Sequence, residues 1–189
     1  MCGVGVWYMK HYHKLVRNCL RGRPKAQRQF FEEFEGLVMG ICLRYAAHAQ
    51  EAEDMFQEVF IRLYDKLETL RDPQALPAWI KQTSVRTVIN LYHAQQKHRH
   101  HLEVSHAESE VSEVGNALDA LTNEELVNVI NQLPERYRLV FNLYVIDGYN
   151  HREIGQLLEM TENTSKSHLM RAKAHIKRQL EGLDRKSVV

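Results

Sequence analysis

Apolar residues recur every three or four positions through most of this chain, as they do along one face of an α-helix. The N-terminal half holds two such stripes, which predict two long amphipathic helices. The first stripe consists of Phe30, Phe31, Phe34, Leu37, Val38, Ile41, Cys42 and Tyr45, and the second of Phe56, Val59, Phe60, Leu63, Tyr64 and Leu67. No convincing alternation of apolar and polar residues indicates a strand. We therefore expect an all-α protein.

Two prolines, Pro73 and Pro77, interrupt the pattern after the second stripe. Proline lacks an amide hydrogen and disfavours helix in the residue before it, so the second helix should end ahead of this segment. Helical spacing resumes at Trp79 and continues to about Arg99. A further helix is expected there.

The C-terminal half begins with a helix-start signal, in which Thr122 and Glu125 have the spacing of a capping box. A second helix should start at Pro134 and stop at Gly148, since glycine tolerates a positive φ. The side chains expected to face the core are Leu126, Val129, Ile130 and Leu133 from the first helix, and Tyr137, Val140, Phe141 and Tyr144 from the second.

The last two predicted helices form a helix-turn-helix between Asn150 and Arg178. Asn150 and Glu153 make another capping box, and Thr161 can cap the second helix after a short turn that begins at Glu159. The expected inward residues are Ile154, Leu157 and Leu158 of the first helix, and Ser165, Leu169, Ala172, Ile176 and Leu180 of the second. The four C-terminal helices should form one module.

The outward face of the last helix suits contact with DNA. At about 100° per residue, this face carries Asn163, Lys166, Ser167, Met170 and Arg171. Residues 161–180 contain five Lys and Arg against one acid, Glu162. Phosphates attract such cations, and polar side chains can reach base edges. The alternative is a surface helix whose charges only keep it solvated.

Charge is segregated along the 189 residues, although the net charge is only +1. Residues 79–101 hold four Lys and Arg and no acid, whereas residues 102–125 hold seven Asp and Glu and no Lys or Arg. The acidic stretch lacks a sustained apolar period, as expected of a linker that buries too little to offset its ordering entropy. We expect domains at 14–101 and 121–183, joined by a flexible linker at 102–120.

Other features exclude several classes of protein. Cys2, Cys19 and Cys42 have no metal or disulfide spacing, which favours a reducing compartment, and Cys42 lies on an apolar stripe. No run approaches the length of a membrane span. The residues before Met9, a possible alternative start, match no periodicity. A cytoplasmic protein without membrane insertion is therefore expected.

Neither a metal site nor an active site is indicated. His93, His98, His100 and His101 point to different helix faces beside Lys97 and Arg99, and no Cys is near, so zinc is disfavoured. A phosphate-binding glycine loop, a nucleophile with a base, and paired carboxylates are all missing from the sequence. We expect no cofactor and no catalytic activity.

Several short motifs, taken in order, resemble one family. They are Ala52-Glu53-Asp54-Met55-Phe56-Gln57-Glu58-Val59-Phe60, Ala78-Trp79-Ile80, Leu133-Pro134-Glu135-Arg136-Tyr137-Arg138-Leu139-Val140-Phe141, Glu153-Ile154 and Thr164-Ser165-Lys166-Ser167. Together they are similar to the extracytoplasmic-function (ECF) sigma factors of bacterial RNA polymerase, a group within the sigma-70 family. The resemblance covers about Leu15 to Leu183. It implies a region 2 helical bundle and a region 4 helix-turn-helix, joined by a flexible linker.

The resemblance also implies partners and site residues. The protein would direct promoter-specific initiation while bound to the clamp and flap regions of core polymerase, and an anti-sigma factor would hold it inactive. For the promoter's minus-thirty-five element the implied residues are Thr161, Asn163, Thr164, Lys166, Ser167, His168, Met170 and Arg171. For the minus-ten element they are Trp79, Lys81, Gln82, Arg86, Asn90, Lys97 and Arg99, with the loop from Leu70 to Pro77 holding a flipped base. For the polymerase they are Asp54, Gln57, Glu58 and Ile61.

Several positions depart from the family's pattern. Arg86 stands where relatives usually have Asn, and Thr83 where they have an apolar residue, so promoter preference differs there. Glu159 replaces a frequent Gly at the turn and would bear a strain of about 1 kcal/mol. His168 replaces a basic residue, which makes its contribution to DNA affinity depend on pH near a pKa of about 6.5.

Alternatives remain open at this point. Trp79 could pack between helices or stack on DNA. The whole chain could be a stand-alone helix-turn-helix regulator that binds DNA without polymerase, with its N-terminal half serving for dimerisation or ligand binding. A protein-interaction adaptor without DNA affinity is a third class.

Overall fold

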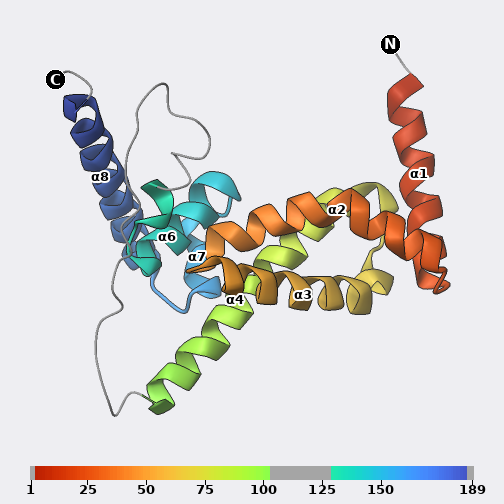
Figure 1. Cartoon of the computed structure of the whole chain (residues 1–189), viewed down its shortest axis with the longest axis horizontal. Coiled ribbons are helices and arrows are strands. Elements are labelled where there is room, and N and C mark those ends of the chain that lie inside the picture. Colours follow the sequence, from red (N-terminus) through yellow and green to blue (C-terminus); the bar gives the residue numbers. More distant parts are fainter. Residues whose placement is uncertain (1–2, 103–128, 187–189) are drawn as a thin grey trace. The chain divides into compact units, whose positions relative to one another are not determined.

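The computed structural model describes the backbone of residues 3–102 and 129–186 and the side chains of residues 11–96 and 129–179. These residues form helices and turns, and none of them lies in a strand. Contacts divide the chain into two compact units, Met1–Gln95 and Gln96–Val189, with the division inside a helix (Figure 1). An all-α protein of two helical domains is confirmed.

The N-terminal unit consists of α1 (Gly3–Leu20), α2 (Pro24–Tyr45), α3 (Ala49–Lys66), two 3-10 turns called η1 (Leu67–Thr69) and η2 (Pro73–Ala75), and the start of α4 (Leu76–Leu102). Helix α2 packs against α3 and α1, and α1 also packs against η2. Buried apolar side chains of α2 and α3 fill the centre, among them Phe30, Ile41, Val59 and Leu63. The two predicted stripes therefore do meet in a core.

Two residues of the first stripe are not in that core. Phe31 is 36% exposed and Leu37 is 40% exposed, whereas Phe30, Phe34 and Val38 are buried. The predicted stripe is therefore not buried across its whole width. Leu37 lies at one edge of the stripe. Phe31 lies near the other edge, where its ring packs on Phe56 and Phe60 of α3 and stays partly exposed. Cys42, by contrast, is fully buried as expected, and burial raises the pKa of its thiol to about 12.

Two helix limits differ from the predicted ones. Helix α1 begins at Gly3, in a segment where the sequence showed no periodicity. Helix α4 begins at Leu76 instead of Trp79, so Pro77 lies inside its first turn. Proline is tolerated there because the first amides of a helix have no intrahelical acceptor.

The C-terminal unit contains a helical stretch at residues 129–131, then α6 (Glu135–Phe141), a π-helical turn called η3 (Asn142–Ile146), α7 (His151–Leu157) and α8 (Glu162–Lys186). Helix α8 packs against α6 and α7. Ile130, Leu133 and Ala172 form a buried cluster, with Tyr137 and Ile176 packed against it. Pro134 precedes α6, and Gly148 has a φ of +81°, both as predicted.

The predicted core face of α6 needs one correction. Tyr144 is 38% exposed, while Leu139 and Leu143 are buried at 2% and 0%. The segment offers two overlapping apolar stripes at helical spacing, and the sequence alone does not rank them. Tyrosine also keeps a polar hydroxyl, which favours the wetter of the two faces.

Some expectations concern residues outside the described part of the chain. These are the capping box of Thr122 and Glu125, the side chains of Leu126 and Leu180, the linker beyond residue 102, and the side chains of Lys97, His98, Arg99, His100 and His101.

Candidate nucleic-acid interface

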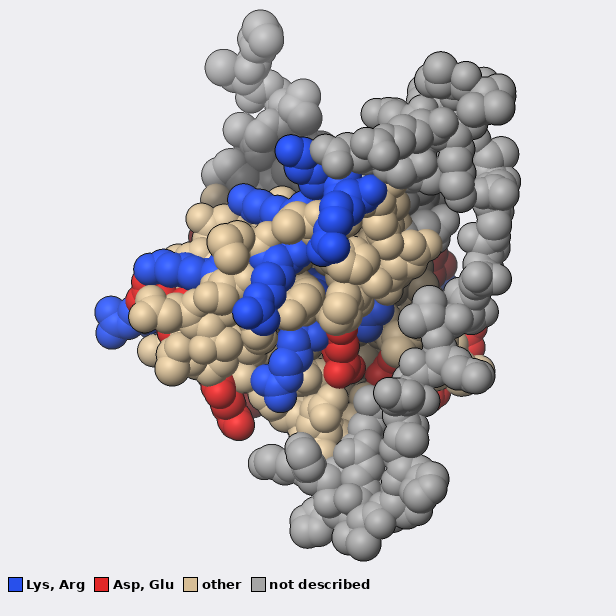
Figure 2. All heavy atoms as spheres, turned by 90° about the vertical axis from the view of Figure 1, so that its left-hand side faces the viewer, with Lys and Arg blue, Asp and Glu red and all other residues tan. Residues whose placement is uncertain are grey.

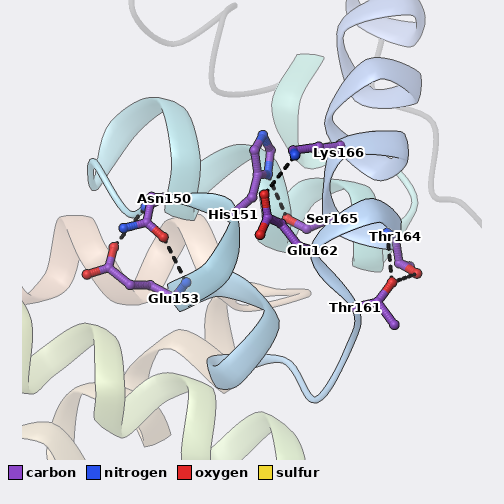
Figure 3. A network of polar contacts seen from close by, with 8 residues as sticks. All are labelled: Asn150, His151, Glu153, Thr161, Glu162, Thr164, Ser165 and Lys166. Carbon is purple, nitrogen blue, oxygen red and sulfur yellow. Dashed lines mark hydrogen bonds and ion pairs between the residues drawn. The ribbon is translucent and has the colours of Figure 1, made fainter.

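The helix-turn-helix is held by side chains that cap both of its helices (Figure 3). Asn150 accepts a hydrogen bond from the amide of Glu153 at 3.0 Å, and the Glu153 carboxylate accepts one from the Asn150 amide at 2.8 Å. At the start of α8, the Thr161 hydroxyl accepts from the amide of Thr164 at 3.1 Å. The capping box at Asn150 and the Thr161 cap are therefore confirmed.

The turn between α7 and α8 is tight. Glu159 has a φ of +52°, so the expected strained residue does sit at the corner. The Met160 amide donates to the carbonyl of Gly155 at 3.0 Å, and a Cβ on Gly155 would lie only 2.7 Å from the Met160 carbonyl oxygen. Gly155 is thus needed for close approach of the turn to α7. This role of Gly155 was not predicted, although a glycine inside a capped helix was the available signal.

Helix α8 buries one face and exposes the other. Ser165 and Ala172 are fully buried and Leu169 is 6% exposed, as predicted. The residues expected to contact upstream promoter DNA lie on the remaining surface: Thr161, Asn163, Lys166, Ser167, Met170 and Arg171 are exposed, and Thr164 and His168 are half-buried. The structure thus places seven of the eight in the N-terminal part of α8, and the eighth, Thr161, caps that helix. Lys166 forms an ion pair with Glu162 at 2.7 Å.

Tyr137 of α6 lies next to this surface. Its hydroxyl accepts a hydrogen bond from Nη1 of Arg171 at 3.2 Å, and its ring packs edge-on against the His168 ring at a centroid distance of 5.1 Å. The same ring packs against the buried cluster of the unit. Tyr137 therefore connects two outward side chains of α8 with the core. From its spacing in the sequence, Tyr137 was predicted only to face the core.

Two histidines in the unit have a lowered pKa. Burial lowers the pKa of His168, and the nearby Arg136 and Arg171 guanidinium groups lower it further. Burial and the Lys166 ammonium lower the pKa of His151. Nδ1 of His151 is 2.9 Å from the Ser165 hydroxyl. The lowered pKa of His168 favours its neutral form.

Positive charge gathers on the side of the molecule that carries α6 and α8. Figure 2 shows Lys and Arg side chains over the upper and central part of this face. The long-range potential of such a surface raises the rate of encounter with polyanions.

Helix α4 presents a polar stripe in the N-terminal unit. Gln82, Arg86 and Asn90 are exposed and follow each other at intervals of four, so they share one face of the helix. Trp79 is half-buried on the same face. Lys81 is half-buried too, but at about 100° per residue it lies on a different side of the helix from Arg86 and Asn90. The buried side of α4 includes Ile80, Val85 and Val88. The structure therefore brings Trp79, Gln82, Arg86 and Asn90 together, and it places Lys81 apart from them.

The expected polymerase-binding residues lie on the outer face of α3. Asp54, Gln57 and Ile61 are exposed, with Ile61 at 54%, and Glu58 is half-buried and forms an ion pair with Arg62 at 3.0 Å. Phe31 of α2 borders this helix, because its ring packs against those of Phe56 and Phe60 at centroid distances of 5.8 and 4.7 Å. The exposed edge of Phe31 adds apolar surface beside this face of α3.

The described residues contain no cluster of three or more His, Cys, Asp or Glu with the geometry of a metal site. Among the same residues, no helix combines the length and the apolar character that a bilayer crossing needs.

Comparison with known proteins covers both units. The family description "Sigma-70 region 2" matches residues 30–98, and "Sigma-70, region 4" matches residues 123–176. The ECF RNA polymerase sigma-E factor of Escherichia coli K12 is 27% identical, covering 91% of this chain and 95% of its own length. The RNA polymerase sigma-H factor of Pseudomonas aeruginosa is 25% identical, covering 92% and 96%.

A solved structure shares the fold. It contains the sigma factor RpoE of Bartonella quintana in complex with the anti-sigma factor NepR, with a TM-score of 0.55 and 16% identity over 82% of this chain and 96% of that chain. None of these matches supports a stand-alone regulator. The two region matches together span more than half of the chain, in the family's order and on the two units seen in the structure. The chain therefore belongs to the sigma-70 family and, within it, to the extracytoplasmic-function group of RNA polymerase sigma factors.

Proposed function

We propose that this sigma factor binds core RNA polymerase through α3 and holds promoter DNA with two separate surfaces, the outward face of α8 and the exposed stripe of α4. The observation that carries the proposal is that both surfaces are polar, exposed and on capped or long helices, while the opposite faces of the same helices are buried. Domains at 14–101 and 121–183, joined by residues 102–120, would carry the two surfaces.

The α8 surface is proposed to read the minus-thirty-five element. A recognition helix presents its N-terminal residues to base edges in the major groove, and Asn163, Ser167 and Arg171 are exposed along that part of α8. Lys166 forms an ion pair with Glu162, which competes with any contact between Lys166 and a phosphate. Both partners are half exposed, however, and a surface pair of this kind is weak enough for a phosphate to compete with it.

The α4 stripe is proposed to contact the minus-ten element. Arg86 supplies the phosphate attraction, and Gln82 and Asn90 supply donors and acceptors for bases. Because unstacking each base costs a few kcal/mol, strand opening without ATP requires contacts that hold the opened strand. The half-buried Trp79 is assigned to packing against its own unit.

The outer face of α3 is proposed to bind the polymerase clamp, with the C-terminal unit on the flap. Ile61 and Phe31 would supply the apolar centre of the α3 contact and Asp54 and Gln57 its polar rim, which is the usual layout of a protein interface. Regulation by an anti-sigma factor is proposed because the sigma factor of the similar solved structure is held by one. The role is non-catalytic and is proposed to be exercised in the cytoplasm.

Core binding tests the proposal. Asp54→Ala/Gln57→Ala should weaken binding of the purified chain to sigma-free core polymerase by at least tenfold, measured by fluorescence anisotropy. Glu53→Ala is the matched control, because it removes one exposed carboxylate from the same helix about 100° around the axis. Equal binding by the double variant and the control would contradict the assignment of this face. Stable, tight dimeric binding to duplex DNA without core would instead support a stand-alone regulator.

A further inference from the structure

One row of residues on α8 faces directly away from the core of the C-terminal unit. Ser165, Leu169 and Ala172 are buried on the inner side of the helix. At about 100° per residue, the positions on the opposite side form a central row. Its members are all exposed and are Asn163, Ser167, Met170 and Ala174. This row is the part of α8 that lies nearest to any ligand docked on the helix.

The central row carries no charge, whereas cations border it on both sides. Lys166, Lys173 and Lys177 lie on one side of it, and Arg171 and Arg178 on the other, all of them exposed. A helix in the major groove of DNA has a phosphate strand on each side and the edges of the bases in front of it. The two cationic borders therefore suit the phosphates, and the uncharged row between them suits the bases.

Met170 is the large apolar side chain of this row. At 66% it is also the most exposed large apolar side chain among the described residues. The other exposed ones of the C-terminal unit, Tyr144, Val145 and Ile146, belong to η3, so the described part of α8 presents Met170 alone. A protein partner usually meets an apolar centre made of several residues. A single apolar side chain in a polar row instead suits a ligand with one small apolar group.

The base edges in the major groove offer one such group. They present hydrogen-bond donors and acceptors and, in addition, the C5-methyl group of thymine. The thioether of Met170 has no hydrogen to donate and accepts only weakly, so it gains little from the polar edges. Its unbranched side chain has three rotatable bonds and can adapt to the position of a methyl group. Of the groups in the groove, the thymine methyl is thus the one that fits Met170.

We propose that Met170 selects thymine at one base pair of the upstream promoter element by packing on the C5-methyl group of that base. The inference rests on the proposed function, since α8 is assigned to that element there. It adds a base preference to a surface that position and charge alone had defined. Because the Met170 side chain is mostly exposed, replacing it removes little packing within the chain, and its variants should fold.

The test selects sequences from a randomised pool of DNA duplexes, using the full chain assembled on core polymerase. The original chain should enrich thymine at one position of the upstream element. Met170→Ala should lose that preference and keep the preferences at the other positions. Met170→Leu stays apolar and should retain the thymine. Met170→Gln has a similar length but is polar, so it should lose the preference.

Lys173→Ala is the matched control, because it truncates another long, exposed side chain of α8 that lies beside the central row. It should weaken binding to all sequences alike by removing a phosphate contact, and it should leave the thymine preference unchanged.

A single methyl group then tests the contact itself. In one selected duplex, the thymine is replaced by 2′-deoxyuridine, which forms the same base pair but lacks the C5-methyl group. This change should weaken binding by the original chain about fourfold, as the loss of one buried methyl-sized group predicts. It should leave binding by Met170→Ala unchanged. Fluorescence anisotropy measures both affinities.

Two results overturn the inference. The first is a thymine preference that Met170→Ala retains; if that variant also binds core polymerase less well, Met170 belongs to a protein contact. The second is equal binding of the thymine and deoxyuridine duplexes by the original chain. Either result leaves the assignment of α8 to the upstream element intact. Failure of the original chain to enrich any upstream element would instead contradict the proposed function, and this inference with it.

Discussion

Tyr137 has its ring against the core of the C-terminal unit and its hydroxyl at the surface, where it accepts a hydrogen bond from Arg171. An arginine side chain loses conformational entropy when it docks on DNA, and a hydrogen bond that already restrains it lowers that cost. The position of Arg171, which is proposed to contact DNA, is thus restrained from a different helix.

Tyr137→Phe should therefore weaken binding to upstream promoter duplex. Loss of the hydroxyl is worth about 0.5–1.5 kcal/mol, or roughly two- to tenfold in affinity. Tyr144→Phe is the matched control, since Tyr144 is exposed and stacks on His151 instead. The loss should disappear when both chains already carry Arg171→Ala. An undiminished loss in that background would show that Tyr137 acts independently of Arg171.

Neutral histidines make the stability of the C-terminal unit depend on pH. The folded chain lowers the pKa of His151 and His168, so below about pH 6.5 the unfolded chain binds more protons. Their contribution to stability is present above that pH and is lost as the pH falls toward the folded pKa values. His151→Gln/His168→Gln should flatten the fall in urea midpoint between about pH 7.5 and 5.5. Parallel curves for variant and original chain would contradict this.

At the scale of elements, the geometry of the helix-turn-helix depends on the close approach of its turn to α7. A Cβ on Gly155 would meet the Met160 carbonyl oxygen at 2.7 Å, and that atom belongs to the backbone and cannot turn away. The same turn holds Glu159 at positive φ. The orientation of the outward face of α8 therefore depends on the contact between Gly155 and Met160 in the turn before α8.

Gly155→Ala should destabilise the C-terminal unit by about 1–3 kcal/mol, as overpacking usually does. Gly36→Ala in α2 is the control with the opposite expected sign. It has open space around the new Cβ, and alanine stabilises a helix interior by about 0.5–1 kcal/mol relative to glycine. Chemical unfolding followed by hydrogen exchange in each unit measures both. An unchanged C-terminal unit in Gly155→Ala would show that the turn can move.

The elements differ in how far their sequence determines them. Caps are local, so the pairs Asn150 with Glu153 and Thr161 with Thr164 could be predicted from a few residues. Which residues of an apolar stripe are buried depends on the neighbouring helices and not on local sequence. Phe31 and Tyr144 are partly exposed, and the apolar spacing alone does not predict this. Helix α1 was not predicted, because its N-terminal residues have no clear apolar period.

The candidate site shows the same division. The outward residues of α8 follow from helical geometry once its inward stripe is known, and the structure places them together as expected. The link from Tyr137 to Arg171 joins residues 34 positions apart, so no local pattern indicates it.

For the whole molecule, the distribution of charge along the sequence matches the division into two units. Two helical units carry the polar surfaces that are proposed to bind DNA, and an acidic segment separates the two units in the sequence. Each unit buries its own core. In the C-terminal unit this core includes the cluster of Ile130, Leu133 and Ala172. Two surfaces on one chain gain avidity when a third body holds both units on the same DNA. Core polymerase is that body in the proposed function.

The most direct measurement is initiation from a library of genomic fragments by sigma-free core polymerase, with and without the purified chain, read out by sequencing the transcript starts. The account predicts new starts at a limited set of promoters that share two upstream sequence elements, and loss of those starts with Asp54→Ala/Gln57→Ala. An unchanged set of transcript starts in the presence of the folded chain would contradict it.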